Sequence, residues 1–290
     1  MRERIASSVW PVSVYSVGEH TQRDRLHQSQ TLDIRMTNRT PEEVRRQIEF
    51  LVPSLLPYVA PVLVYPRVGR GIDGWITGGT VLLARTKHHR FLVTADHFVT
   101  EIDKLRQSSD VVVLLGVPGT SLTDITLWPI IARDDHVDIC TIQIPQEAEC
   151  EGLDEHCFKL DLCQSTRARV GDNALIMGFP KLHREASEGR LNARVLPILD
   201  YVTDVGDRRF TIADENARRE VLINPHNLSF PDHVGGMSGA PVFRVSKSDP
   251  PSLIGVLSES GDGLRGAHFC AHADFILPDG SLDHMALPPR

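Results

Sequence analysis

The sequence predicts an all-β protein, an antiparallel barrel or sandwich, with a helical segment ahead of it. From residue 60 onward, short runs rich in Val, Ile, Leu and Phe recur between Gly-rich or charged breaks. Runs of this length and spacing are typical of antiparallel sheets. Hydrophobic residues make up 41% of the 290 residues and charged residues 24%, which is the composition of a globular chain.

Residues 1–56 form an N-terminal extension with one predicted helix and a short strand near its start. Thr40 is expected as the N-cap, Pro41 lies in the first turn, and Glu43 completes a capping box. Apolar residues follow at helical spacing, and Pro53 is expected to end the helix. Such an apolar stripe usually docks on the protein's own core. The alternative is a surface for a regulatory partner.

The β-like runs divide into two groups. In the first group we expect strands at residues 61–65, 79–83, 90–94, 110–115, 127–131 and 139–144. A segment rich in acids and cysteines, residues 145–168, then resembles a crossing between two halves. In the second group we expect strands at 193–199, 209–212, 220–223, 241–245 and 253–261, before a proline-rich tail.

A serine in a glycine-rich turn, Ser238 in the run that starts at Gly235, is the strongest chemical signal. Glycines there leave room for a substrate to approach both the hydroxyl and the backbone amides. Upstream, His97 follows one apolar run and Asp138 opens another. A serine nucleophile needs a base, and the base needs an acceptor that fixes its tautomer. The three residues therefore form a candidate catalytic set.

Each member of this set has a plainer interpretation when taken alone. His97 could be a hydrogen-bonded core histidine, and Ser238 an ordinary turn residue. Asp138 could be a solvated acid at a strand end, and Asp134 and Asp135 are close enough to compete for its role. The order His, Asp, Ser, with gaps of 41 and 100 residues, favours the joint interpretation.

An α/β-hydrolase is the rival for a nucleophilic serine. That fold needs the serine at a strand-to-helix elbow and the chain order Ser, acid, His. Here Pro241 leads from the serine turn into a β-like run, and no alternation of strands and helices surrounds it. The local context excludes this rival.

At these three points the chain resembles the chymotrypsin/trypsin-like serine peptidases, especially the bacterial trypsin-like peptidase domains. The resemblance implies a chymotrypsin-like double antiparallel β-barrel behind the N-terminal helical extension. The first barrel would span residues 57–150 and carry His97 and Asp138. Residues 151–290 would hold the interbarrel crossing, the second barrel with Ser238, and the C-terminal tail.

The resemblance also implies a role for each residue in a serine endopeptidase. Ser238 would attack a carbonyl carbon of a protein or peptide, His97 would take its proton, and Asp138 would hold the imidazole. The backbone N–H groups of Gly236 and Ser238 would form the oxyanion hole. The alternative is a catalytically silent or latent protein of the same fold that acts as a regulatory protein-binding module.

Substrate-binding residues follow from the same resemblance. Ser258, Glu259 and Ser260 would lie on the strand that lines the substrate. Asp232, six residues before the serine, would lie at the base of the specificity pocket and favour Arg or Lys side chains. The plainer interpretation of Asp232 is a solvated loop acid. Met237 occupies the position where trypsin-like zymogens carry an activating aspartate, so activation through that ion pair is not expected.

Composition bears on partners and location. The formal net charge of −7 gives no reason to expect a nucleic-acid partner. No apolar run approaches the length of a membrane span, and the first residues lack the apolar core of a signal peptide. We therefore expect no membrane partner and a cytoplasmic protein.

The cysteines support the same expectation. The five lie at positions 140, 150, 157, 163 and 270, an odd number, and none is next to the histidine or shortly before the serine, where secreted relatives carry them. This usage favours a reduced setting. We expect no cofactor and no metal. The alternative is a zinc site made by Cys150, His156, Cys157 and Cys163, although their spacing is not a paired C-x-x-C pattern.

Overall fold

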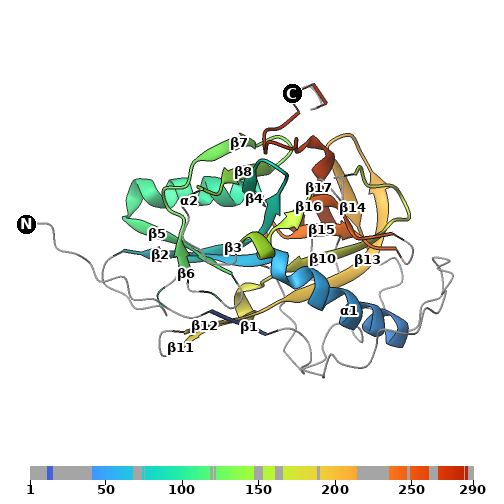
Figure 1. Cartoon of the computed structure of the whole chain (residues 1–290), viewed down its shortest axis with the longest axis horizontal. Helices are drawn as coiled ribbons and strands as arrows, with labels where there is room; N and C mark the ends of the chain where they lie inside the picture. Colours follow the sequence, from blue (N-terminus) through green and yellow to red (C-terminus); the bar gives the residue numbers. More distant parts are fainter. Residues whose placement is uncertain are drawn as a thin grey trace, which may run out of the picture.

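The computed structural model of the chain describes residues 12–15, 41–67, 74, 76–117, 120, 122–146, 153–160, 166–187, 190–213, 235–246, 249–260, 267–283 and 285–286. The two main sheets are a half-barrel in the first part of the chain and a closed six-stranded barrel in the second (Figure 1). This is the chymotrypsin-like double β-barrel architecture that the sequence predicts, with a helix at its N-terminal side.

The half-barrel has the strand order β6-β5-β2-β3-β4-β8-β7, and β9 pairs with β3 beside this path. Its strands are β2 (Val59–Pro66), β3 (Thr77–Arg85), β4 (Arg90–Thr94), β5 (Val111–Gly116), β6 (Leu122–Asp124), β7 (Ile130–Asp134), β8 (Ile139–Gln143) and β9 (Phe158–Lys159). Neighbours along the path are antiparallel, and β9 runs parallel to β3. The apolar runs of β2, β3 and β4 are buried almost throughout because the core and α2 cover their two faces.

The closed barrel has the strand order β10-β13-β14-β17-β16-β15. Its strands are β10 (Asn173–Gly178), β13 (Leu196–Val205), β14 (Arg209–Ile212), β15 (Pro241–Arg244), β16 (Ser252–Ser260) and β17 (His268–His272). All of its pairings are antiparallel. Ile176, Phe210, Ile254 and Cys270 are among the buried residues of its own core.

A small third sheet flanks the two barrels. It consists of β11 (Arg184–Ser187), β12 (Arg190–Arg194) and β1 (Val12–Tyr15), in the order β1-β12-β11. β1 runs parallel to β12, with Val14 opposite Ala193, and Ala193 in turn lies opposite Arg184. A strand of the N-terminal extension is therefore one strand away from Arg184.

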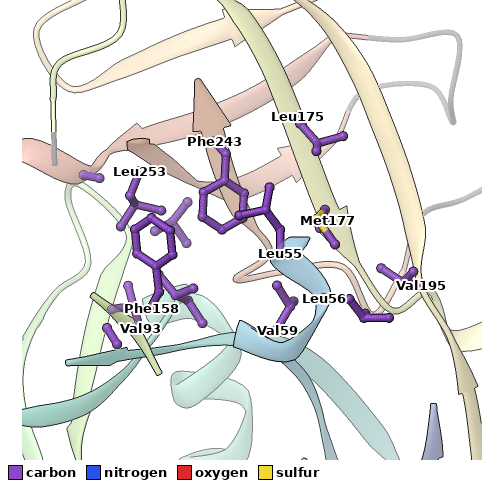
Figure 2. Packing of buried hydrophobic residues seen from close by; sticks show 14 of the residues in the cluster. Leu55, Leu56, Val59, Val93, Phe158, Leu175, Met177, Val195, Phe243 and Leu253 are labelled. Atoms are coloured by element: carbon purple, nitrogen blue, oxygen red, sulfur yellow. The ribbon is translucent and has the colours of Figure 1, made fainter. Parts of the chain in front are cut away.

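Helix α1 (Pro41–Leu55) docks on the main body, as its apolar stripe predicts. It continues through Pro53, so the prediction that this proline ends the helix is wrong. Val52 and Leu55 are buried in a cluster that draws on both barrels, and this packing outweighs the hydrogen bond lost at the proline. Figure 2 shows Leu55 next to Phe243, with Phe158 in the same group. The ring centroids of Phe158 and Phe243 lie 5.2 Å apart.

Helix α2 (Asp96–Ser108), which begins one residue before His97, is not predicted from the sequence. Charged residues interrupt the segment, and they hide the buried positions Phe98 and Ile102 at helical spacing. The expected strand at 127–131 begins only at Ile130, and β17 has no counterpart among the predicted strands. The strand expected at 220–223 lies outside the described residues.

Candidate active site

His97 and Asp138 are brought together by neighbouring strands. β4 pairs with β8, with Thr94 opposite Cys140. His97 follows the end of β4 and Asp138 precedes the start of β8, so both lie at the same edge of the sheet. The imidazole Nδ1 is 2.8 Å from Asp138 Oδ2 and 3.1 Å from Oδ1, and the His97 backbone N–H donates to Oδ1 at 2.8 Å. One carboxylate therefore fixes both the ring and the backbone of the histidine.

The turn before β8 presents Asp138 rather than its neighbours. Asp138 has φ 61°, in the left-handed region that Asp adopts more readily than most residues. Asp134 Oδ1 instead accepts from the backbone N–H groups of His136 and Val137, which fixes the turn. Among the candidate acids of this turn, the one hydrogen-bonded to His97 is Asp138.

The contact shifts the pKa of both partners. The hydrogen bond to Asp138 raises the pKa of His97 above 6.5, and burial opposes this only in part. Burial works against ionisation of Asp138, but the hydrogen bonds and charge of His97 outweigh it and lower the pKa of the carboxyl. Ser258 Oγ is buried without a hydrogen bond of standard geometry, yet its interaction with Asp138 also favours the carboxylate. The pair therefore stabilises an imidazolium next to an ionised acid.

The Ser238 turn is hydrogen-bonded to β3 and packs against the end of β4, just before His97. The Thr80 backbone N–H donates to the carbonyl of Ser238 at 2.9 Å. Gly239 has φ +85°, and a Cβ there would lie 2.1 Å from Thr94 Oγ1 and 3.0 Å from Ala95 N. Only glycine can pack so closely against the residues that lead into α2. No hydrogen bond joins Ser238 Oγ to His97 within the described residues, and such contacts are often long in ligand-free enzymes.

Two carbonyls of the turn accept hydrogen bonds, which sets the direction of the N–H group that follows each of them. The carbonyl of Gly235 accepts from Lys181 N at 2.7 Å, and the carbonyl of Met237 accepts from Ala240 N at 2.8 Å. In a trans peptide the N–H points opposite to the C=O, and the described residues contain no cis peptide bond. The N–H groups of Gly236 and Ser238 therefore point away from the amides of Lys181 and Ala240, respectively.

A buried arginine that the sequence analysis does not identify supports this turn. Arg184 Nη2 donates to the carbonyls of Gly236 (2.8 Å), Gly79 (3.1 Å) and Phe179, and Nη1 donates to Val62 O at 3.2 Å. The guanidinium thus links carbonyls of both barrels beneath the serine turn. Burial lowers the pKa of Arg184 to about 9. No local sequence pattern marks a residue whose partners are this distant in the chain.

The expected substrate strand runs alongside the serine turn. Leu257 on β16 exchanges hydrogen bonds with Gly239 and Ala240, so the next residues of β16 continue past the serine. Ser258 is buried and interacts with Asp138, and Glu259 is exposed.

Ser260 Oγ lies 2.9 Å from Nδ1 of the buried His268, a contact that the sequence analysis does not anticipate. Of the three expected substrate-binding residues, Ser258 interacts with Asp138, and Glu259 and Ser260 pair with β17. Asp232 lies outside the described residues.

Two further sequence features have structural roles. Met237 is fully buried in the core of the second barrel, so a hydrophobic anchor holds the residue before the serine. Cys157 donates to the Leu153 carbonyl, and burial raises the pKa of its thiol to about 11. His156 Nδ1 lies 3.1 Å from the Pro57 carbonyl oxygen.

No group of three or more His, Cys, Asp or Glu residues in the described part of the chain could hold a metal ion. Cys150 and Cys163 of the zinc alternative lie outside that part. None of the helices that the structure describes is long and apolar enough to cross a membrane.

Comparison with known proteins finds similarity only at the level of structure. No protein-family model matches the chain, and no curated protein matches its sequence. One similar solved structure is that of HBP, at 17% identity and a TM-score of 0.46, covering 77% of this chain and 88% of HBP. Another is Deg5, at 15% identity and a TM-score of 0.49, covering 83% of this chain and 97% of Deg5. The fold assignment above therefore rests on the strand topology of this chain itself.

Proposed function

We propose that this protein is a serine endopeptidase that cleaves peptide bonds with Ser238, His97 and Asp138. The observation that carries the proposal is the buried carboxylate of Asp138, hydrogen-bonded to His97 Nδ1 at the edge where the serine turn docks. The N–H groups of Gly236 and Ser238 would add the second requirement of acyl transfer, a site for the developing oxyanion.

The mechanism follows from these positions. Asp138 accepts a hydrogen bond from Nδ1–H of His97, which leaves Nε2 as the lone-pair nitrogen that takes the Ser238 proton. Ser238 Oγ attacks the carbonyl carbon of the scissile bond, and the negative oxygen is stabilised by the N–H groups of Gly236 and Ser238. His97 then protonates the leaving amine, and water attacks the acyl-enzyme by the same route. Because Asp138 raises the pKa of His97, the proton is readily held between the two steps.

The alternative is a silent or latent protein of the same fold that acts as a regulatory binding module. The missing hydrogen bond between Ser238 Oγ and His97 favours the binding module. A distorted turn between Gly235 and Ser238 would favour it more strongly. The turn instead has its carbonyls bonded to the protein body. This geometry supports the enzymatic proposal over the alternative.

Labelling with a fluorophosphonate probe tests the proposal directly. Wild-type protein is expected to be labelled at Ser238, and both Ser238→Ala and His97→Ala are expected to abolish labelling, with losses up to about 10⁶-fold. Circular dichroism confirms that each variant is folded. Folded wild-type protein that takes no label would favour the binding module.

A preference for basic side chains is the finer part of the proposal. A carboxylate at Asp232 would pair with Arg or Lys of the substrate, and the exposed Glu259 on β16 adds negative charge near the site. We expect a peptide library to be cleaved after basic residues, and Asp232→Ala to lower that preference. Asp172→Ala, in the turn before β10, is the control. Cleavage dominated by apolar residues and unchanged in Asp232→Ala would refute the preference.

The setting and the partners complete the proposal. Cys140, Cys157 and Cys270 are buried free thiols, which supports a reduced, cytoplasmic enzyme. A regulatory partner that displaced β1 from β12 would bind one strand away from Arg184. Because Arg184 donates to the carbonyl of Gly236, such a partner could affect the serine turn through this arginine. We therefore place any partner of the N-terminal extension at this small sheet.

A further inference from the structure

Arg133 lies on β7, one strand beyond β8, and its side chain reaches back to helix α2. Its Nε donates to Asp96 Oδ1 at 2.6 Å, and Nη2 lies 3.3 Å from Oδ2. Nη2 also donates to Thr100 Oγ1 at 2.6 Å, and Nη1 to Asp103 Oδ2 at 2.8 Å. The guanidinium therefore binds three side chains along the first turns of one helix.

These contacts join the two segments that carry the candidate base and its acid. Asp96 immediately precedes His97, and Arg133 is separated from Asp138 only by the β7–β8 turn. The Asp96 side chain is 3% exposed and that of Arg133 33%. A two-pronged guanidinium–carboxylate pair constrains direction as well as distance, and more so when the carboxylate is buried.

Other connections leave this spacing incompletely fixed. The β4–β8 ladder pairs Thr94 with Cys140, but both His97 and Asp138 lie beyond the paired residues. The direct hydrogen bond between them is the interaction that must hold while the ring gains and loses a proton. The ion pair between Arg133 and Asp96 connects the same two segments and keeps them in place while His97 gains and loses its proton.

We propose that Arg133 is a positioning residue for the candidate catalytic pair, holding α2 against the β7–β8 turn through Asp96 and so setting the His97–Asp138 geometry. The proposal rests on the function proposed above, because a positioning role has meaning only where His97 acts as a base. The Asp96–Arg133 pair thus positions His97 relative to Asp138, which an ordinary surface ion pair does not do.

Charge gives the proposal a distinctive signature. The carboxylates that raise the pKa of His97 are Asp138 on the β8 side and Glu101 and Asp96 on its own helix. Arg133, on β7, partly neutralises Asp96. If Arg133 sets the geometry, removing it loosens the Asp138 hydrogen bond, the largest cause of the raised pKa of His97, and this pKa falls. If Arg133 only neutralises Asp96, removing it leaves that carboxylate uncompensated, and the pKa of His97 rises.

The sign of the pH effect follows from the role of the ring. His97 must be neutral to accept the Ser238 proton, so labelling falls as pH drops through its pKa. The acid limb of the wild-type profile therefore lies above pH 6.5. The positioning role therefore predicts that both Arg133→Gln and Asp96→Asn move this limb to lower pH.

The experiment measures fluorophosphonate labelling rates against pH in the full chain, with the His97 ring titrated in parallel by NMR. Arg133→Gln is expected to slow labelling about 10–100-fold above the acid limb, because small displacements of reacting groups have costs of this size. Arg133→Lys is expected to restore part of that loss. Arg106→Gln is the matched control, because Arg106 pairs with Asp103 on the same helix but does not contact Asp96.

The outcomes separate this inference from the proposed function. If Arg133→Gln is folded and matches Arg106→Gln in labelling rate and in the His97 titration, the positioning role is wrong. If wild-type protein takes no label, the proposed function fails, and the NMR titration alone still decides whether the loss of Arg133 lowers the pKa of His97. Equal titrations in all variants would overturn the proposal in that case too.

Discussion

Asp138→Asn is expected to slow acylation of Ser238 by about 10⁴-fold while leaving the fold intact. The Asp138 carboxylate accepts from both the ring and the backbone of His97. An asparagine has one acceptor oxygen, and its amide N–H₂ turned toward Nδ1 would favour the tautomer protonated on Nε2. That tautomer cannot take the serine proton. Asparagine also tolerates the positive φ of this position, so the turn is retained.

The measurement is the pseudo-first-order rate of fluorophosphonate labelling, with thermal unfolding followed by circular dichroism. Asp134→Asn is the matched control, because its side-chain oxygen can still accept from His136 and Val137 without contacting His97. Its labelling rate should stay within about threefold of the wild type, since neutral hydrogen bonds of this kind are worth about 1 kcal/mol. An Asp138→Asn protein that labels as fast as this control would show that another group orients the base.

The sequence predicts those features whose signal is local. The β-like runs are read from residues adjacent in the chain, and β4, β14 and β16 lie close to their predicted positions. The glycines around Ser238 mark a tight turn for the same reason, and Gly236 and Gly239 do adopt positive φ. The catalytic roles of His97 and Asp138 remain predictions, although the structure places the two side chains in contact.

The missed features depend on distant partners. Helix α2 was hidden because its solvated face carries many charges, and only its packing against the half-barrel identifies the buried face. The helix propensity of Pro53 predicts that α1 ends there. The helix continues to Leu55 because burial of Leu55 in the core stabilises the last turn. Arg133 binds Asp96, 37 residues away, and Arg184 binds Gly236, 52 residues away, so no short window of sequence contains both sides of either contact.

Arg184→Met is expected to be the most damaging substitution outside the candidate catalytic set, for both stability and labelling. The side chain is buried and donates to the backbone carbonyls of Val62, Gly79, Phe179 and Gly236. Methionine fills a similar volume but donates nothing, and each buried acceptor left without its donor costs about 1–3 kcal/mol. Relief of the cost of burying a cation offsets part of this, so we expect a net loss of about 2–4 kcal/mol in the free energy of unfolding.

The same substitution should slow labelling more than its effect on stability explains. Without Arg184, the carbonyl of Gly236 keeps only the Thr80 hydroxyl, at 3.1 Å, among its described partners. The peptide between Gly236 and Met237 is then held more weakly, and its rotation disturbs the amide directions on both sides of it. Loss of one oxyanion donor costs about 10²–10³-fold, so folded Arg184→Met is expected to label at least about 10²-fold more slowly.

Arg167→Met separates the two effects. Arg167 also donates to two backbone carbonyls, those of Gly206 and Asp207, but it is 40% exposed and makes none of its described contacts with the serine turn. We expect it to lose about 1 kcal/mol or less of stability and to label normally. Chemical denaturation and labelling well below the unfolding midpoint give both quantities for each variant. If folded Arg184→Met labels as fast as Arg167→Met, the serine turn holds its geometry without the arginine, and the buried guanidinium joins the two barrels without supporting the oxyanion hole.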